Sequence, residues 1–154
     1  MLIVIAGERC TGKSALAHAL MEKINAEFFS GRDYLRLAPT EPVALKRFQT
    51  LLAEKQHSED YLIYLLTEPN LYSLVPPDSF VVMCRSRLET SKARFARQMP
   101  DGVLSPSIAA MLERQRGSFD RIPHSLTLDT DGADLSLLAV EVLEQAEIAR
   151  TAHG

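Results

Sequence analysis

Tryptophan is absent from this sequence of 154 residues, and cysteine and histidine are scarce, with two and four residues respectively. Cys10 and Cys84 cannot form a disulfide framework and the histidines are scattered, so we expect free thiols and no zinc site. No apolar run reaches the roughly 18 residues that a membrane span needs. The net charge of −3 gives no general attraction to nucleic acid or to an anionic membrane. We therefore expect small-molecule partners, with no nucleic acid and no membrane among them.

An export signal is missing as well. The apolar run from Leu2 to Ala6 has no basic segment before it and is too short for the apolar part of such a signal. We therefore expect a cytoplasmic protein. With 154 residues, of which 46% are hydrophobic, the chain can form one domain, 1–154, and has no room for a second core.

What the sequence does have is the segment GERCTGKS, residues 7 to 14, directly after that apolar run. Two glycines separated by four residues and followed by lysine and serine have the spacing of a phosphate-binding P-loop. Gly7 and Gly12 leave room for successive backbone N–H groups to turn toward a phosphate. Lys13 can place its ammonium against the outer phosphates, and Ser14 can ligate Mg²⁺ at the start of the next helix. The segment therefore predicts a nucleotide site with Mg²⁺.

The same loop supplies the rest of the expected nucleotide site. Arg9, Cys10 and Thr11 lie between the glycines, and Ala15 follows in the first turn of the helix. Cys10 has two interpretations, because it is either a reactive thiol near a helix N-terminus or a small residue that fills the loop.

Short apolar runs alternate with helical patterns along the chain. Strands are expected at 2–6, 26–29, 61–66, 80–84 and 124–129, with a helix as the rival interpretation of 61–66. Helices are expected at 15–24, 43–55, 86–99, 106–116 and 133–150. This alternation predicts an α/β three-layer sandwich with a five-stranded parallel sheet, helices on both faces and right-handed crossovers. Ligands of such sheets gather at the carboxyl ends of the strands. The residues expected there are Gly7 to Ser14, Asp33, Glu68, Arg85 and Asp129 to Gly132.

Positive charge is concentrated in one segment. Residues 85 to 121 hold eight Lys or Arg against four acids, which leaves nine bases and sixteen acids elsewhere from totals of 17 and 20. At about 100° per residue, one side of the helix expected at 86–99 carries Arg87, Thr90, Arg94 and Arg97. This stripe is either a solvated face or a source of the cations that phosphoryl transfer needs at the γ-phosphate.

The P-loop, the segment FVVMCRSRLETSKARFARQ and the ending LTLDTDG resemble the P-loop kinases of small molecules. This group contains nucleoside monophosphate kinases, shikimate kinase and chloramphenicol phosphotransferase, and the match covers nearly the whole chain in order and length. The resemblance implies the P-loop NTPase fold, ATP- and Mg²⁺-dependent phosphoryl transfer to a small molecule, and a short lid at about 97–107. Arg94 and Arg97 would then close on the γ-phosphate, and Asp131 and Gly132 would lie beside the adenine.

The segment FFSGRDYLRLAP resembles the stretch after the second strand of these kinases. Asp33 stands where an acid commonly serves as base toward the acceptor, although it can also be a turn residue after Gly31. Arg36 is placed like an acceptor-binding arginine, with Arg32 beside it, and Glu68 or Asp33 could assist the metal through water. The arginines favour an anionic acceptor, whereas a base favours a hydroxyl. We therefore expect a nucleoside monophosphate or a small hydroxylated, anionic metabolite.

Two family motifs are missing. The Asp-Gly-Phe-Pro-Arg run of adenylate kinases and the second Gly-Gly motif of shikimate kinases do not occur, so the sequence names no acceptor. The alternative function is a nucleotide-binding P-loop regulatory protein without phosphotransfer activity, because binding and chemistry use the same loop.

Overall fold

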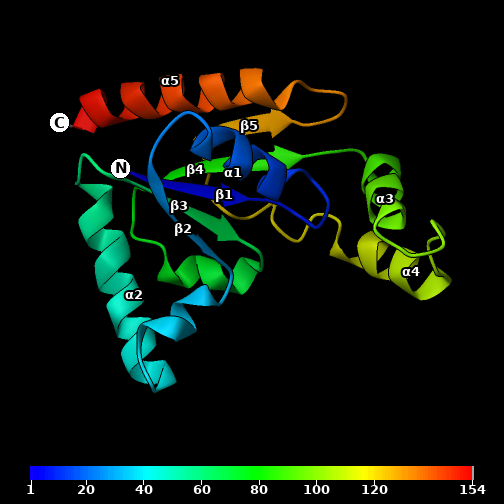
Figure 1. The fold of residues 1–154 in the computed structure, drawn as a ribbon, viewed down its shortest axis with the longest axis horizontal. Coiled ribbons are helices and arrows are strands. Elements are labelled where there is room, and N and C mark those ends of the chain that lie inside the picture. The colour runs from blue at the N-terminus through cyan, green and yellow to red at the C-terminus, as the bar shows by residue number, and fades with distance from the viewer. Residues whose placement is uncertain (154) are drawn as a thin grey trace.

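A five-stranded parallel sheet forms the centre of the computed structural model, which describes residues 1–153 (Figure 1). Its strands lie side by side in the order β2-β3-β1-β4-β5. Their bounds are Leu2–Ala6 (β1), Ala26–Ser30 (β2), Tyr61–Leu66 (β3), Phe80–Arg85 (β4) and Leu126–Asp129 (β5). The predicted α/β sandwich with five parallel strands is confirmed, and the apolar run at 61–66 is a strand.

Helices connect these strands and cover both faces of the sheet. The α-helices are Lys13–Met21 (α1), Glu41–Gln56 (α2), Leu88–Arg97 (α3), Pro106–Gln115 (α4) and Leu135–His153 (α5), and the 3-10 helices are Asp33–Leu37 (η1) and Pro69–Leu74 (η2). Each expected helix is present, with its ends moved by a few residues. None of the helices in residues 1–153 combines the length and the apolar character that crossing a membrane requires.

The central strand β1 contributes to two separate cores, because successive side chains of a strand point to opposite faces. Leu2, Val4 and Ala6 face the core on the side of α2 and η1. Ile3 and Ile5 face the core on the side of α1 and α5. All five side chains are buried, as expected for a strand with a parallel neighbour at each edge and helices on both faces.

An aromatic cluster fills the first of these cores. The ring of Phe48 in α2 is fully buried, and its centroid lies 5.1 Å from that of Phe29, 5.5 Å from that of Tyr34 and 5.0 Å from that of Tyr64. The Tyr34 ring is stacked on it and the Tyr64 ring meets it edge-on, both of which are favourable arrangements. Through Tyr34 the cluster fixes η1, the short helix that begins at Asp33.

Two helices stand beyond the carboxyl edge of the sheet instead of on its faces. In Figure 1, α3 and α4 form a small lobe at the end toward which the strand arrows point. The start of α4 is well defined, because the Ser105 hydroxyl accepts the Ile108 N–H at 3.3 Å and Pro106 stands in the first turn. Residues 98–105 join the two helices, within the segment expected as a lid.

Candidate active site

The P-loop joins the end of β1 to the start of α1 in a conformation that depends on its glycines. Gly7 has φ +148°, and a Cβ there would lie 2.5 Å from the Cys84 carbonyl oxygen in β4. Gly12 has φ +90°, and a Cβ there would lie 3.2 Å from Thr130 Cγ2. Any larger residue at Gly7 would thus collide with backbone, so the loop is shaped as the sequence predicts.

Lys13 begins α1 and turns its side chain back into the loop. Its ammonium donates to the Gly7 carbonyl at 2.6 Å and to the Glu8 carbonyl at 2.7 Å. Burial lowers the pKa of this ammonium from 10.5 to about 8, and the positive charge of Arg9 acts in the same direction. The charged group is therefore held at the loop by carbonyl oxygens that a bound phosphate could replace.

The other expected nucleotide-binding residues follow the loop. Ser14 and Ala15 are exposed in the first turn of α1, and Arg9 is exposed at the loop surface. Thr11 is buried, and its hydroxyl donates to the Glu8 carbonyl at 2.7 Å. Cys10 is half-buried with φ +59°, and burial raises the pKa of its thiol. A raised pKa favours the neutral thiol, which agrees better with the loop-filling interpretation than with a reactive one.

The loop after β5 supports the P-loop from the side. Thr130 is buried, and its hydroxyl donates to the Thr11 carbonyl at 2.7 Å. The next residue, Asp131, accepts the Arg87 backbone N–H at 3.0 Å and the Arg87 Nε–H at 3.1 Å, and these bonds lower the pKa of its carboxyl. Gly132 follows with φ +61°. Asp131 thus ties the start of α3 to the loop expected beside the adenine.

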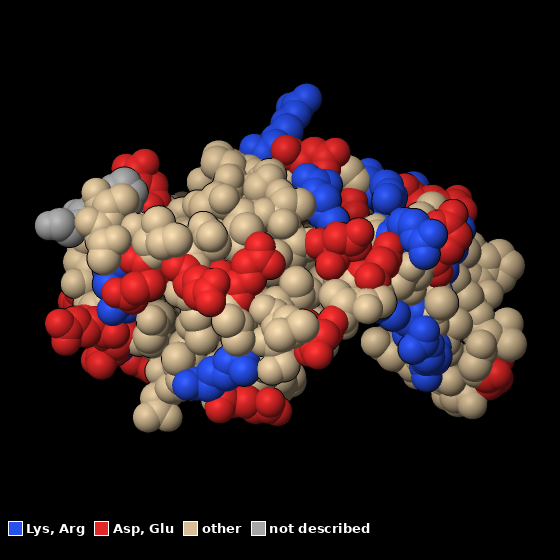
Figure 2. All heavy atoms as spheres, turned by 90° about the horizontal axis from the view of Figure 1, so that it is seen from above, with Lys and Arg blue, Asp and Glu red and all other residues tan. Residues whose placement is uncertain are grey.

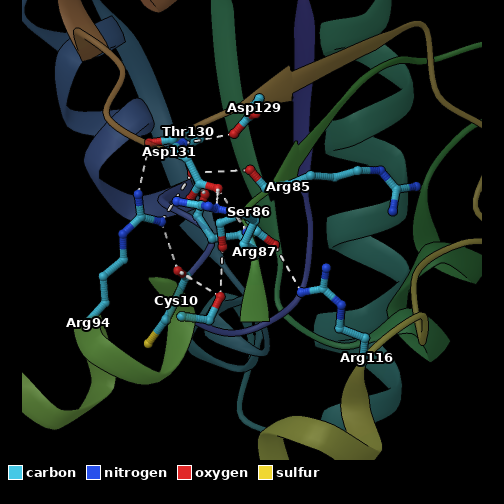
Figure 3. A network of polar contacts seen from close by, with 11 residues as sticks. Cys10, Arg85, Ser86, Arg87, Arg94, Arg116, Asp129, Thr130 and Asp131 are labelled. Atoms are coloured by element: carbon cyan, nitrogen blue, oxygen red, sulfur yellow. Dashed lines mark hydrogen bonds and ion pairs between the residues drawn. The ribbon is translucent and has the colours of Figure 1, made fainter. Parts of the chain in front are cut away.

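Arg94 connects three segments that are far apart in sequence. Its guanidinium donates to the Cys10 carbonyl at 2.9 Å, to the Thr130 hydroxyl at 3.1 Å and to the Thr130 carbonyl at 2.9 Å (Figure 3). We call Arg94, Cys10 and Thr130 the Arg94 network. Arg94 therefore packs against the P-loop and the loop after β5, whereas Arg97, one turn further along α3, is exposed.

The segment after α4, residues 116–119, also contacts the P-loop and the start of α3. The Glu8 carboxylate in the P-loop accepts the Gly117 N–H, and Arg116 donates to the Ser86 carbonyl at 3.0 Å. Phe119 is buried, and its ring centroid lies 6.0 Å from the Lys13 ammonium nitrogen. The segment Arg116–Phe119 thus lies close to the P-loop on the side of the aromatic core.

The expected acceptor residues lie at the ends of β2 and β3. One oxygen of Asp33 accepts the Ser30 N–H at 2.9 Å, and Arg32 lies 3.5 Å from Glu68 as an exposed pair. Arg36 instead packs back on β2, with its guanidinium 4.4 Å from the Phe29 ring centroid and 3.3 Å from the Phe28 carbonyl. The structure brings Arg32 and Glu68 together, while the contacts of Arg36 are with β2.

At the carboxyl edge of the sheet, the surface of the main body and that of the lobe of α3 and α4 differ in charge. Figure 2 shows a notch between the main body and the lobe of α3 and α4, with basic side chains on the lobe's side and acidic ones on the body's side. In residues 1–153 no group of three or more His, Cys, Asp or Glu could hold a metal ion by itself.

Some residues of this site were missed by sequence reasoning. Gly117 and Phe119 were not expected, and neither was the contact of Glu8 with Gly117, because these contacts join segments whose distance in sequence gives no local pattern. The sequence did give one indication of Thr130, because it lies in the stretch Asp129 to Gly132, which is expected at the carboxyl ends of the strands beside the P-loop.

The sheet order, the glycine-shaped loop and the lysine at the helix start define the fold of the P-loop small-molecule kinases. No family model matches the sequence, and no curated protein matches it.

Solved structures do match, over nearly the full length of both chains. A sugar kinase from Janibacter sp. HTCC2649 has 17% identity and a TM-score of 0.62, covering 97% of this chain and 96% of its own. A gluconokinase from Sinorhizobium meliloti 1021 has 16% identity and a TM-score of 0.62, covering 98% and 94%. A shikimate kinase from Acinetobacter baumannii, in complex with shikimate, has 16% identity and a TM-score of 0.61, covering 94% and 92%. At these identities the likeness is one of fold, and it confirms the fold that the resemblance implied.

Proposed function

We propose that this protein is an ATP- and Mg²⁺-dependent kinase that transfers the γ-phosphoryl group to a hydroxyl of a small, anionic metabolite. The observation that carries the proposal is the P-loop itself, in which Gly7 leaves no room for a side chain and Lys13 points its ammonium into the loop. The kinases among the solved structures with this fold support the same reaction class.

The P-loop would bind the phosphates of ATP. Lys13 would exchange the Gly7 and Glu8 carbonyls for phosphate oxygens, and the loop N–H groups together with the start of α1 would hold the remaining phosphate charge. Ser14 would hold Mg²⁺, which supplies positive charge to the phosphates when bound. Asp131 and Gly132 would lie beside the base. Arg97, which is exposed on the lobe, would reach the γ-phosphate when the lid at about 97–107 closes.

Asp33 is the residue that would act on the acceptor. Within residues 1–153 only its Oδ2 is hydrogen-bonded, to the Ser30 N–H, so Oδ1 is available to orient the hydroxyl of the acceptor or take its proton. Arg32 can bind an acidic group of the acceptor, because its exposed pair with Glu68 is of low strength and easily replaced. The contacts of Arg36 make it a support for β2 and Phe29 in this scheme. A gluconokinase and a shikimate kinase are both named for hydroxylated carboxylic acids, which fits this acceptor class.

The test is ADP production by the purified protein with ATP, Mg²⁺ and a panel of hydroxylated acids, sugar acids and nucleoside monophosphates. A kinase releases ADP in proportion to one added acceptor. ADP release that no acceptor stimulates would contradict the kinase and favour the nucleotide-binding regulator, which uses the same loop.

Once an acceptor is found, Asp33→Asn tests the proposed base. We expect ATP affinity to stay within about twofold and turnover to fall by about 10²-fold or more, because the amide cannot take the proton. Asp134→Asn is the matched control, since Asp134 also accepts a backbone N–H near a helix start, that of Ser136 at 2.9 Å. If Asp33→Asn turns over as fast as this control, Asp33 is a turn residue only.

A further inference from the structure

A cavity of about 520 Å³ opens at the opposite edge of the sheet from the P-loop. It lies at the amino ends of the strands, where Leu2 and Phe80 begin β1 and β4, and where α2 and α5 both end (left side of Figure 1). The volume is in the range of about 300 to 1,000 Å³ found for small-molecule sites. The five residues of β1 separate it from the P-loop by about 16 Å, so the two sites cannot share a ligand.

The walls of this cavity are held in place by hydrogen bonds. Gln56 donates to the Pro77 carbonyl at 2.7 Å, and the Ser79 hydroxyl donates to the Pro76 carbonyl at 2.7 Å. Between them, Asp78 has φ +61°, a left-handed conformation that aspartate adopts in turns more readily than most residues other than glycine. The loop at 76–79 is therefore fixed in one shape at the mouth of the cavity.

Arg150 on α5 also lines the cavity, and part of its guanidinium has no acceptor. Its Nη2 is buried and makes no hydrogen bond to any residue in the described part of the chain. The guanidinium carbon lies 5.1 Å from the Tyr61 ring centroid, and Nη1 lies 3.7 Å from the Glu147 carboxylate, too far for a hydrogen bond. Nη2 is closed off and does not face the cavity, but the side chain as a whole is 32% exposed in the cavity wall. Because the ion pair with Glu147 is long, an anion in the cavity can replace Glu147 as the partner of this guanidinium.

The remaining polar lining can bind hydroxyl groups. Ser58, Ser79 and Ser125 bring hydroxyls to the cavity, and Glu59 and Asp78 bring two carboxylates that accept hydrogen bonds. A ligand that is only an anion would meet those carboxylates unfavourably, whereas a ligand with hydroxyls would donate to them. We propose that this cavity is a second binding site, for a small hydroxylated carboxylate whose acid group binds Arg150 and whose hydroxyls contact the serines and acids.

The experiment is an NMR titration of the full-length, nucleotide-free protein with three separate probes, malate, glycerate and gluconate. Glycerol is the uncharged control. We expect at least one of the acids to give saturable shifts of the amides at 57–59, 78–80 and 125 and of Arg150, with Gly7–Ser14 unmoved. Arg150→Gln should weaken this binding at least tenfold, while Arg114→Gln, an exposed arginine on α4, should leave it unchanged.

A second variant guards against a folding defect in the first. Ser79→Leu narrows the cavity without changing charge, and it should also abolish the shifts while the melting temperature and the amide spectrum away from the cavity stay as in the unmodified protein. Three outcomes would overturn the proposal: no saturable shift with any of the three acids, equal shifts with glycerol, or shifts confined to the P-loop and Asp33. Because the readout needs no turnover, the proposal can fail or hold independently of the kinase assignment.

Discussion

The ammonium of Lys13 is held by two carbonyl oxygens in a buried part of the P-loop, where its pKa falls to about 8. Bound phosphate would hold the proton on Lys13, so its pKa in the complex must be higher than in the free protein. Binding therefore takes up a proton above about pH 8. We predict that the affinity for ATP is nearly constant from about pH 7 to 8 and then weakens, approaching about tenfold per pH unit.

Calorimetric titration of ATP between about pH 7 and 9.5 measures this dependence, and repeating it in buffers of different ionisation enthalpy counts the proton directly. Lys13→Met should bind weakly and without the break near pH 8. A constant affinity of the unmodified protein up to about pH 9.5 would show that the ammonium is not the group that meets the phosphates.

At the scale of single residues, the sequence predicts what a short segment determines by itself. Gly7, Gly12 and Lys13 lie within one segment of eight residues, and the requirement for glycine follows from local backbone geometry. The contact of Arg94 with Cys10 spans 84 residues and that with Thr130 spans 36, so only the folded sheet brings them together. The stripe pattern identified Arg94 as a residue of interest, but it did not give these partners.

The Arg94 network joins two elements, α3 and the P-loop. Arg94→Gln removes donors from the Cys10 and Thr130 carbonyls, and we predict a loss of about 1 to 2 kcal/mol in the free energy of unfolding. Amide hydrogen exchange at Cys10, Thr11 and Thr130 should become faster because the P-loop loses its side support. Urea unfolding and exchange experiments measure the two effects.

Arg97→Gln is the control for this change, because Arg97 lies on the same helix but is exposed. It should alter the free energy of unfolding by no more than about 0.5 kcal/mol. Equal stability of the two variants would mean that the Arg94 network adds nothing to the packing of α3 on the P-loop.

The aromatic cluster around Phe48 anchors α2 and η1 to the sheet. Phe48→Ala would leave a cavity next to the rings of Phe29, Tyr34 and Tyr64, and we predict a cost of about 3 to 5 kcal/mol in the free energy of unfolding. Amide hydrogen exchange in η1 should also become faster, since Tyr34 loses its stacking partner. Phe48→Leu retains part of the buried surface, so it should lower the free energy of unfolding clearly less than Phe48→Ala does. An equal loss in the two variants would show that the rings are not closely packed.

At the scale of elements, β3 shows what the sequence could not decide. The run Tyr61–Leu66 is continuously apolar, and such a run has no periodicity that separates a buried strand from a buried helix. The structure settles it through its neighbours, because β3 pairs with β1 on one side and β2 on the other. Element ends were less predictable for a similar reason, since capping contacts such as that of Arg87 with Asp131 come from distant segments.

For the molecule as a whole, nucleotide binding should be visible as stability. A ligand that binds only the folded state at about 100 times its Kd adds about 2.7 kcal/mol. For a chain of this size, that corresponds to a rise in Tm of about 5 to 10 °C. A thermal melt with Mg²⁺ and a non-hydrolysable ATP analogue measures it, and Lys13→Met should abolish the rise. An unchanged melting curve for the unmodified protein would contradict a nucleotide site at the P-loop.

The sheet order has a consequence for synthesis on the ribosome. β1 leaves the exit tunnel first, yet its two neighbours are β3 and β4, and Thr130 must also arrive before the Thr11 carbonyl has its donor. The P-loop of the nascent chain therefore lacks part of its support until Thr130 has left the tunnel. If the P-loop binds nucleotide as proposed, the nucleotide can stabilise the fold only after β3, β4 and Thr130 have joined β1 and the loop.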